Sequence, residues 1–209
     1  MLCTALLAAP RAFAQKTGSA AGAPAEYRGL YASINLRPAE EMIRRLSVQY
    51  GTDRRVAIRE VLGRPSLHMP PVFYALANTL AEDQPEQAIF WYHVGRLRAV
   101  YDALRCRDKW AQVQGLLALR RQVGTELARS QFYRRDRLPG IARKAVDWDA
   151  SNARDYDHRW IALNGKLAQT SPGTDADEVT VPESEWPAIL KRVHETHLKS
   201  VQDFVDEKK

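Results

Sequence analysis

Residues 70–106 read PPVFYALANTLAEDQPEQAIFWYHVGRLRAVYDALRC, and this stretch decides the fold class. Apolar residues recur every three or four positions on both sides of the DQPE turn, which is the spacing of helices that bury one face. Proline opens both halves, where the first turn of a helix tolerates it. The turn and the two apolar faces predict an antiparallel helical hairpin. Small residues lie where its two helices would approach closely, at Ala77, Ala88 and Gly95.

The hairpin resembles one unit of a tetratricopeptide or Sel1-like protein, most clearly in AIFWY at residues 88–92. A repeat array needs about three units to be stable, and the sequence offers one good unit. The resemblance therefore predicts a single hairpin of this kind and no solenoid.

Helical signals dominate the rest of the chain as well. Apolar residues at helical spacing, bounded by Gly or Pro, predict further helices at residues 37–50, 52–63, 108–133, 139–148 and 183–206. Gly115 and Gly124 each weaken the third of these by about 1 kcal/mol relative to Ala, so it is expected to bend or break. We predict an irregular loop at residues 149–165, a polar linker at 169–182 that could include a short strand near 179–181, and an all-α fold: an irregular multi-helix bundle.

The N-terminus predicts export. Residues 1–9 are mostly apolar, and Ala12-Phe13-Ala14 before Gln15 has the Ala-x-Ala form of a signal-peptidase site. We predict a signal peptide, a flexible mature N-terminus and a single helical domain, at residues 1–14, 15–25 and 26–209 respectively. The segment lacks the basic residues that normally precede the apolar run, so a frayed N-terminal segment stays open as the alternative. Export would place the protein in the periplasm of a Gram-negative cell.

Charge bears on the choice of partner. The 209 residues carry a net charge of +6, and no apolar run approaches the roughly 20 residues that span a bilayer, so membrane insertion is not predicted. Between residues 129 and 144 a single acid, Asp136, faces six basic residues: Arg129, Arg134, Arg135, Arg137, Arg143 and Lys144. Such a patch attracts nucleic acid, an anionic surface or an acidic protein, or it is simply a solvated helix end. Nucleic acid is the least available of these partners after export, and we predict none.

The motifs of common enzyme classes are absent. The sequence contains no Gly-x-Ser-x-Gly elbow, phosphate-binding loop, dinucleotide-binding turn or His-Glu-x-x-His motif. Cys106, the only cysteine after signal cleavage, is interpreted as a small buried hydrophobe. We therefore predict no catalytic residue, no metal site and no cofactor, and we do not expect an enzyme.

Two patterns keep an unfamiliar catalytic site open as a hypothesis. His194 and His197 share a helix face, and His158 or an acid could approach them in the fold. The pairs Asp147–Asp149 and Asp155–Asp157 could supply two carboxylates, although such aspartates more often cap helices. A cleft that gathered His194, His197 and a carboxylate would favour an enzyme.

One loop is the best candidate for binding a protein. Arginine and large aromatic side chains dominate binding hot spots, and they are concentrated here in consecutive residues: Tyr156, Asp157, His158, Arg159 and Trp160. The alternative is that Trp160 and Ile161 anchor the loop in the core while its charged residues are solvated. Both interpretations can hold together.

Four segments resemble a set of small exported bacterial proteins, associated with immunity proteins that accompany antibacterial effectors of type VI and type IV secretion systems. They are residues 70–77, 88–99, 102–106 and 156–165. The resemblance implies a periplasmic protein that binds a cognate effector toxin, such as a cell-wall or lipid hydrolase, and blocks it sterically. A Sel1-like or tetratricopeptide-like envelope adaptor is the alternative. Neither interpretation predicts an oligomeric state.

Overall fold

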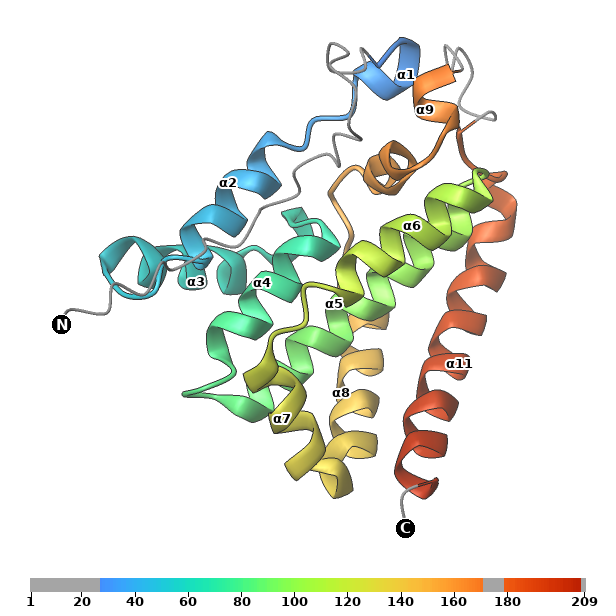
Figure 1. Ribbon diagram of the computed structural model, residues 1–209. Helices are drawn as coiled ribbons and strands as arrows, with labels where there is room; N and C mark the ends of the chain where they lie inside the picture. Colours follow the sequence, from blue (N-terminus) through green and yellow to red (C-terminus); the bar gives the residue numbers. More distant parts are fainter. Residues whose placement is uncertain (1–26, 171–178, 208–209) are drawn as a thin grey trace, which may run out of the picture.

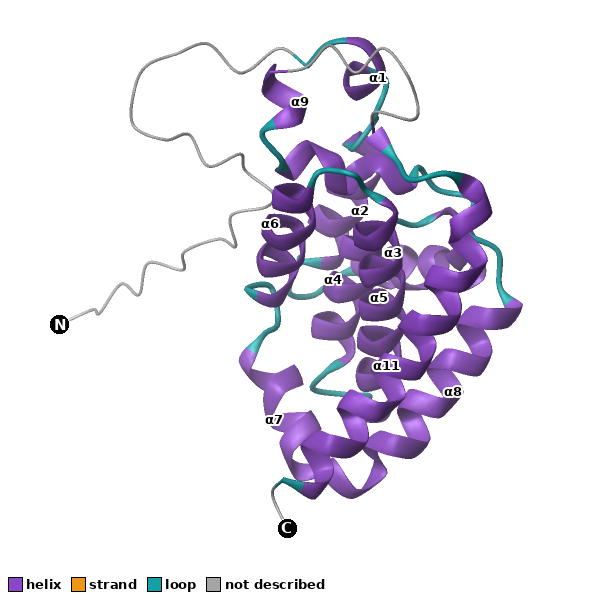
Figure 2. Ribbon diagram, turned by 90° about the vertical axis from the view of Figure 1, so that its right-hand side faces the viewer, coloured by secondary structure: helices purple, strands orange, loops and turns teal. Residues whose placement is uncertain are grey.

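The computed structural model describes residues 27–170 and 179–207, and across them the fold is an all-α multi-helix bundle (Figures 1 and 2). This confirms the predicted fold class. The predicted signal peptide at residues 1–14 and the predicted flexible segment at 15–25 lie outside the described residues, as does most of the predicted linker.

The predicted hairpin forms the centre of the bundle. Helix α4 (Pro70–Leu80) packs along α5 (Pro85–Arg105) in the largest helix–helix interface of the described residues. Gly95 explains how closely they approach, because a Cβ atom there would lie 2.9 Å from the Cβ of Phe73. A side chain at position 95 would therefore push the two helices apart.

Helix α5 lies at the centre of the bundle, and most of the longer helices pack against it (Figure 1). It contacts α6 (Lys109–Arg120), α7 (Thr125–Tyr133), α8 (Leu138–Ser151) and α11 (Trp186–Asp206). Helix α2 (Arg37–Leu46) packs on α4 and on α3 (Thr52–Gly63). The shorter elements are α1 (Gly29–Ala32), η1 (Pro65–Leu67), η2 (Arg135–Arg137), η3 (His158–Asn164), α9 (Leu167–Thr170) and η4 (Glu183–Glu185).

The break expected in the helix at residues 108–133 occurs at Gly124, which precedes the first residue of α7, so the segment forms two helices, α6 and α7. The break is held by Asn78, whose amide donates to the carbonyl of Gln122 (2.6 Å) and accepts from the backbone N–H of Gly124 (2.9 Å). Gly115 stays inside α6, where a Cβ atom would lie 2.6 Å from Cγ1 of Ile161. That glycine permits close packing between α6 and η3, and it does not end the helix.

The irregular loop predicted at residues 149–165 is shorter than expected. Helix α8 continues to Ser151, and η3 accounts for residues 158–164, so 152–157 is the irregular part. The strand considered near residues 179–181 is reduced to one isolated bridge between Cys106 and Thr180. The interpretation of Cys106 as a buried hydrophobe is confirmed: the thiol is free, and burial raises its pKa to about 11.

Candidate functional site

The predicted binding loop is anchored in the core by its aromatic residues. Trp160 is only 2% exposed, and its indole N–H donates to Oδ2 of Asp102 at 2.7 Å. The hydroxyl of Tyr156 donates to Oδ1 of the same aspartate at 3.3 Å. The alternative interpretation, that Trp160 and Ile161 anchor the loop, is therefore the one that the structure shows for these residues, and the Trp160 ring is not available to a partner in this conformation.

Asp102 is a fully buried carboxyl group on α5. Its third hydrogen bond comes from Arg105, one turn along the helix, at 2.6 Å. Burial raises the pKa of Asp102 to about 6, because the loss of hydration outweighs the favourable interactions with Arg105, Trp160 and Tyr156. This carboxyl group joins the loop to the central helix.

The other three loop residues are partly exposed. Asp157 caps η3 by accepting from the backbone N–H of Arg159, and its carboxylate also pairs with the Arg159 guanidinium at 2.7 Å. His158 packs edge-on against Trp186 of α11, with ring centroids 4.9 Å apart, and burial lowers the pKa of His158 to about 4. The polar groups of these side chains are thus used largely within the loop and against α11.

A second buried carboxylate, Asp149 of α8, lies at the centre of a cationic network. Arg98 donates to Oδ1 at 3.1 Å, while Arg154 and His194 approach Oδ2 at 2.6 and 3.0 Å. Burial alone would raise the pKa of Asp149, but the hydrogen bond from His194 and the charges of Arg154 and Arg98 outweigh it, so the pKa is lowered. Asp149 is held as a carboxylate that joins α5, α8 and α11.

A pair of histidines lies beside this network. Nε2 of His197 is 3.0 Å from Nδ1 of His93, and both residues are buried between α11 and α5. Burial, followed by the charge of Arg96, lowers the pKa of His197 to about 4, and burial also lowers that of His93 well below 6.5. Both imidazoles are therefore neutral near pH 7.

The structure thus brings His194 and a carboxylate together, with His197 one helical turn away, as the enzyme hypothesis required. However, Asp149 is already paired with two arginines, and these groups lie inside the helix interface. Within residues 27–170 and 179–207, no three His, Cys, Asp or Glu side chains are grouped to hold a metal ion. Asp147 and Asp155, the other members of the acidic pairs, are exposed. The arrangement fits a role in joining helices.

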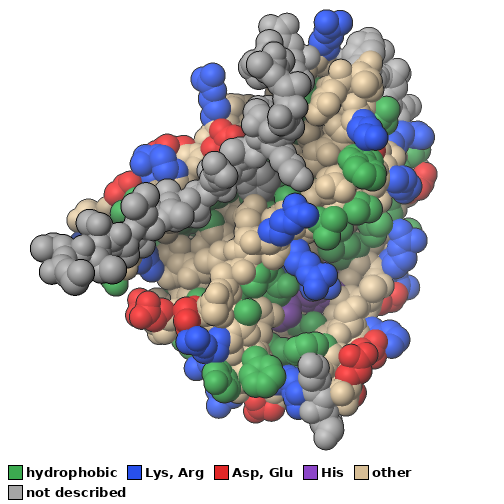
Figure 3. Space-filling model, in the orientation of Figure 1, with side chains coloured by type: hydrophobic (Ala, Val, Ile, Leu, Met, Phe, Trp, Pro, Cys, Tyr) green, Lys and Arg blue, Asp and Glu red, His purple; other side chains and the backbone are tan. Residues whose placement is uncertain are grey.

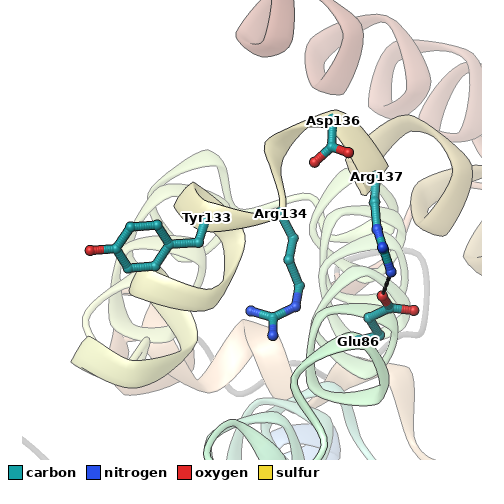
Figure 4. A pocket seen from close by; sticks show the side chains of 5 residues that line it. All are labelled: Glu86, Tyr133, Arg134, Asp136 and Arg137. Carbon is teal, nitrogen blue, oxygen red and sulfur yellow. Dashed lines mark hydrogen bonds and ion pairs between the residues drawn. The ribbon is translucent and has the colours of Figure 1, made fainter.

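The most exposed aromatic pair lies at the end of α7. Phe132 and Tyr133 are 59% and 72% exposed, and their rings meet edge to face with centroids 5.7 Å apart. Tyr133 borders a shallow pocket of about 430 Å³, which is shared with Glu86, Arg134, Asp136 and Arg137 (Figure 4). We call Phe132, Tyr133 and Arg134 the α7 patch.

Arg134 is the free cation of this patch. In Figure 4 its guanidinium lies between the Tyr133 ring and the Arg137–Glu86 ion pair. Among the described residues Arg134 makes no ion pair of its own. An exposed aromatic pair beside an uncommitted guanidinium has the composition of a protein-binding hot spot.

The sequence places Phe132 on the helix predicted at residues 108–133 but does not show which way its side chain faces. In the structure the chain leaves α6 at residues 121–124, and Phe132 is exposed near the end of α7. The basic stretch at residues 129–144 did indicate this region. What the sequence did not show is which side chains of α7 face solvent, because that depends on where α6 ends.

No family model, curated protein or solved structure matches the chain. The link to immunity proteins therefore stays a prediction. What the molecule can do is inferred from the contacts, burial and charges described above.

Proposed function

We propose that this chain is a periplasmic immunity protein that binds a cognate antibacterial effector and neutralises it sterically. The α7 patch carries the proposal. Its two aromatic side chains offer a large area for desolvation, and Arg134 offers a planar cation that pairs with a carboxylate in two-point geometry. The partner is accordingly expected to present an acidic and apolar surface.

The interior supports a binding role more than a catalytic one. Asp149 and Asp102 are the two fully buried carboxyl groups of the part of the chain that the structure describes, and both accept hydrogen bonds from arginine or aromatic donors that link separate segments. These contacts hold α5, α8 and α11 together, and α7 packs against α5.

The α7 patch lies at the opposite end of α5 from η3 and the predicted loop (Figure 1). The two surfaces can therefore be tested separately. The loop contributes Asp157, His158 and Arg159, which stay predicted partner contacts. Its remaining members, Tyr156 and Trp160, hold the loop in place.

The direct test is competition between sibling cells in contact. A strain that lacks this protein should be outcompeted by its parent on a solid surface, and survival should return when the wild-type chain is restored. A strain carrying F132A, Y133A and R134A together should remain sensitive, although the protein accumulates to the normal level in the periplasmic fraction. Restored survival with this triple variant would remove the patch from the proposal.

A matched control removes two basic side chains from the same stretch, residues 129–144, at positions without a neighbouring exposed aromatic pair. Arg143 and Lys144 are exposed on α8, and R143A with K144A should protect as the wild type does. If the deletion strain survives contact as well as its parent, the immunity function itself is refuted. A deletion strain that instead shows a defect in assembly of envelope machinery would favour the adaptor.

A further inference from the structure

Helix α6 is apolar on its outer face as well as on its inner one. Ala111, Gly115 and Leu119 face the core, as expected. On the opposite side Trp110, Val113 and Leu117 are 52%, 53% and 37% exposed. These three recur at helical spacing, so they form one continuous strip along the helix, which we call the α6 ridge.

The ridge is bordered by cations on both sides. Lys109 and Arg120 follow one edge and Arg121 the other, and none of the three makes an ion pair with another described residue. Nζ of Lys166 lies 5.1 Å from the Trp110 ring centroid, next to the exposed Leu167. On the face shown in Figure 3, basic and hydrophobic side chains are interspersed.

The segment that forms the ridge carries no acidic side chain of its own. The sequence has no Asp or Glu between Lys109 and Thr125. Asp108, just before the helix, is buried and caps it by accepting from the backbone N–H groups of Trp110 and Ala111 at 2.8 and 3.2 Å. The positive charge along the ridge is therefore not neutralised by its own helix.

We infer that the α6 ridge docks the protein on an anionic lipid surface. A helix that lies in the membrane interface presents a strip with tryptophan and aliphatic side chains, bordered by lysine and arginine whose alkyl stems extend toward the headgroups. Anionic headgroups attract each such cation, which adds to burial of the apolar strip. The α6 ridge has this arrangement, and peripheral docking needs no helix that spans the bilayer.

Two other occupants fit the ridge less well. A second copy of the chain would place Lys109, Arg120 and Arg121 against the same cations, and like charges repel. A protein that received the ridge would need an apolar groove with acidic residues along both of its edges, whereas an anionic bilayer offers an apolar layer beneath negatively charged headgroups over its whole surface. This docking surface is separate from the α7 patch, so it does not depend on the proposed immunity function.

The test measures binding of the full chain to vesicles of phosphatidylglycerol and phosphatidylethanolamine by cosedimentation. Vesicles of phosphatidylcholine are the neutral comparison. The chain should bind the anionic vesicles, and added salt should weaken that binding. Trp110 is the exposed one of the five tryptophans, since Trp91 and Trp160 are buried and Trp148 and Trp186 are half-buried. Brominated phosphatidylglycerol should quench the fluorescence, and the share of the quenching that W110F removes is the share that reports on the ridge.

Matched variants separate the ridge from the rest of the chain. The triple variant W110S, V113S and L117S should bind anionic vesicles about tenfold more weakly, since it loses most of the apolar area available for burial. The double variant V48S and Y50S alters exposed apolar residues elsewhere and should bind as the wild type does. All variants carry the same N-terminal residues, so any binding by those residues is common to them. Thermal unfolding followed by circular dichroism checks that each variant is folded.

The inference is overturned if the folded chain does not bind anionic vesicles. It is also overturned if the ridge variant binds them as the wild type does, or if brominated lipid leaves Trp110 unquenched. Survival in the contact assay tests the α7 patch and immunity separately, so failure of either proposal can be recognised without the other.

Discussion

Asp149 and Asp102 are both fully buried, both accept from an arginine, and their pKa values move in opposite directions. Asp149 faces Arg98, Arg154 and His194, and the sum of these interactions exceeds the cost of removing the carboxylate from water. Asp102 faces one arginine, while its other donors, Tyr156 and Trp160, are neutral. Burial alone therefore does not determine the direction in which the pKa of a carboxyl group moves; the hydrogen bonds and cations around it decide.

The largest expected effect comes from Asp149→Asn, which removes the negative charge that Arg98 and Arg154 share. We expect the free energy of unfolding at pH 7 to fall by about 3–5 kcal/mol, because Arg98 and Arg154 lose their countercharge inside the protein. Urea unfolding measures this change. Asp147→Asn on the same helix is the control, since Asp147 is exposed and its substitution should change stability by less than about 0.5 kcal/mol. Equal effects of the two substitutions would show that Asp149 does not join the helices.

The stability of the folded chain should also depend on pH through His197, which lies on α11 next to the Asp149 network. The pKa of His197 is lowered from 6.5 to about 4, so the unfolded chain binds this proton before the folded one. Stability from this group is complete above pH 6.5 and is lost as pH falls, by about 3 kcal/mol between pH 6.5 and 4. Urea unfolding across this range measures the slope. The double variant H93L and H197L should flatten that slope, and an unchanged slope would contradict the prediction.

Asp102→Asn tests the opposite case, a buried carboxyl group whose pKa is raised. Because the pKa of Asp102 is raised to about 6, the folded chain binds this proton before the unfolded one. Its contribution to stability is therefore complete below pH 3.8 and is lost as pH rises through 6. At pH 7 the substitution should cost about 1–2 kcal/mol through the ion pair with Arg105. At pH 5 the wild-type carboxyl group is mostly protonated in the folded chain and the wild type has gained stability that the Asn variant cannot gain, so the cost should be larger than at pH 7 by about 1 kcal/mol. A cost that shrinks as pH falls below 6 would refute the raised pKa.

Tyr156→Phe should have the smallest effect. It removes one long hydrogen bond to Asp102, and we expect a loss of about 0.5–1 kcal/mol. Without this donor the pKa of Asp102 should rise further, which ¹³C NMR of the side-chain carboxyl carbon measures directly. Tyr50→Phe, at an exposed position, is the control. A downward move of the Asp102 titration would show that the Tyr156 hydroxyl does not donate to the carboxylate.

Much of the fold could be predicted because its signals are local. The spacing of apolar residues places α2, α3, α4, α5 and α11 within a few residues of their observed ends. Between residues 108 and 133 the expected break is found at Gly124, but apolar residues occur around the whole helix, so their spacing did not identify its inner face. Asn78 decides the break there, from a helix more than 40 residues earlier in the chain.

The candidate site was less predictable for the same reason. Arginine and aromatic residues in the loop at 156–160 were recognisable, but their partner Asp102 lies more than 50 residues earlier. Likewise the basic stretch at residues 129–144 was visible, whereas the outward orientation of Phe132 was not. A pattern identifies which residue types are present, and packing determines which of them face solvent.

The sequence by itself determined the all-α class, the central hairpin and the burial of Cys106, because helical period and hydrophobicity act over a few neighbouring residues. Tertiary structure alone decided that Asp149 stays charged, that Trp160 lies inside, and that Trp110 and Tyr133 lie outside. Each of these depends on contacts between helices distant in the chain, where the balance of desolvation and charge is set by which side chains meet.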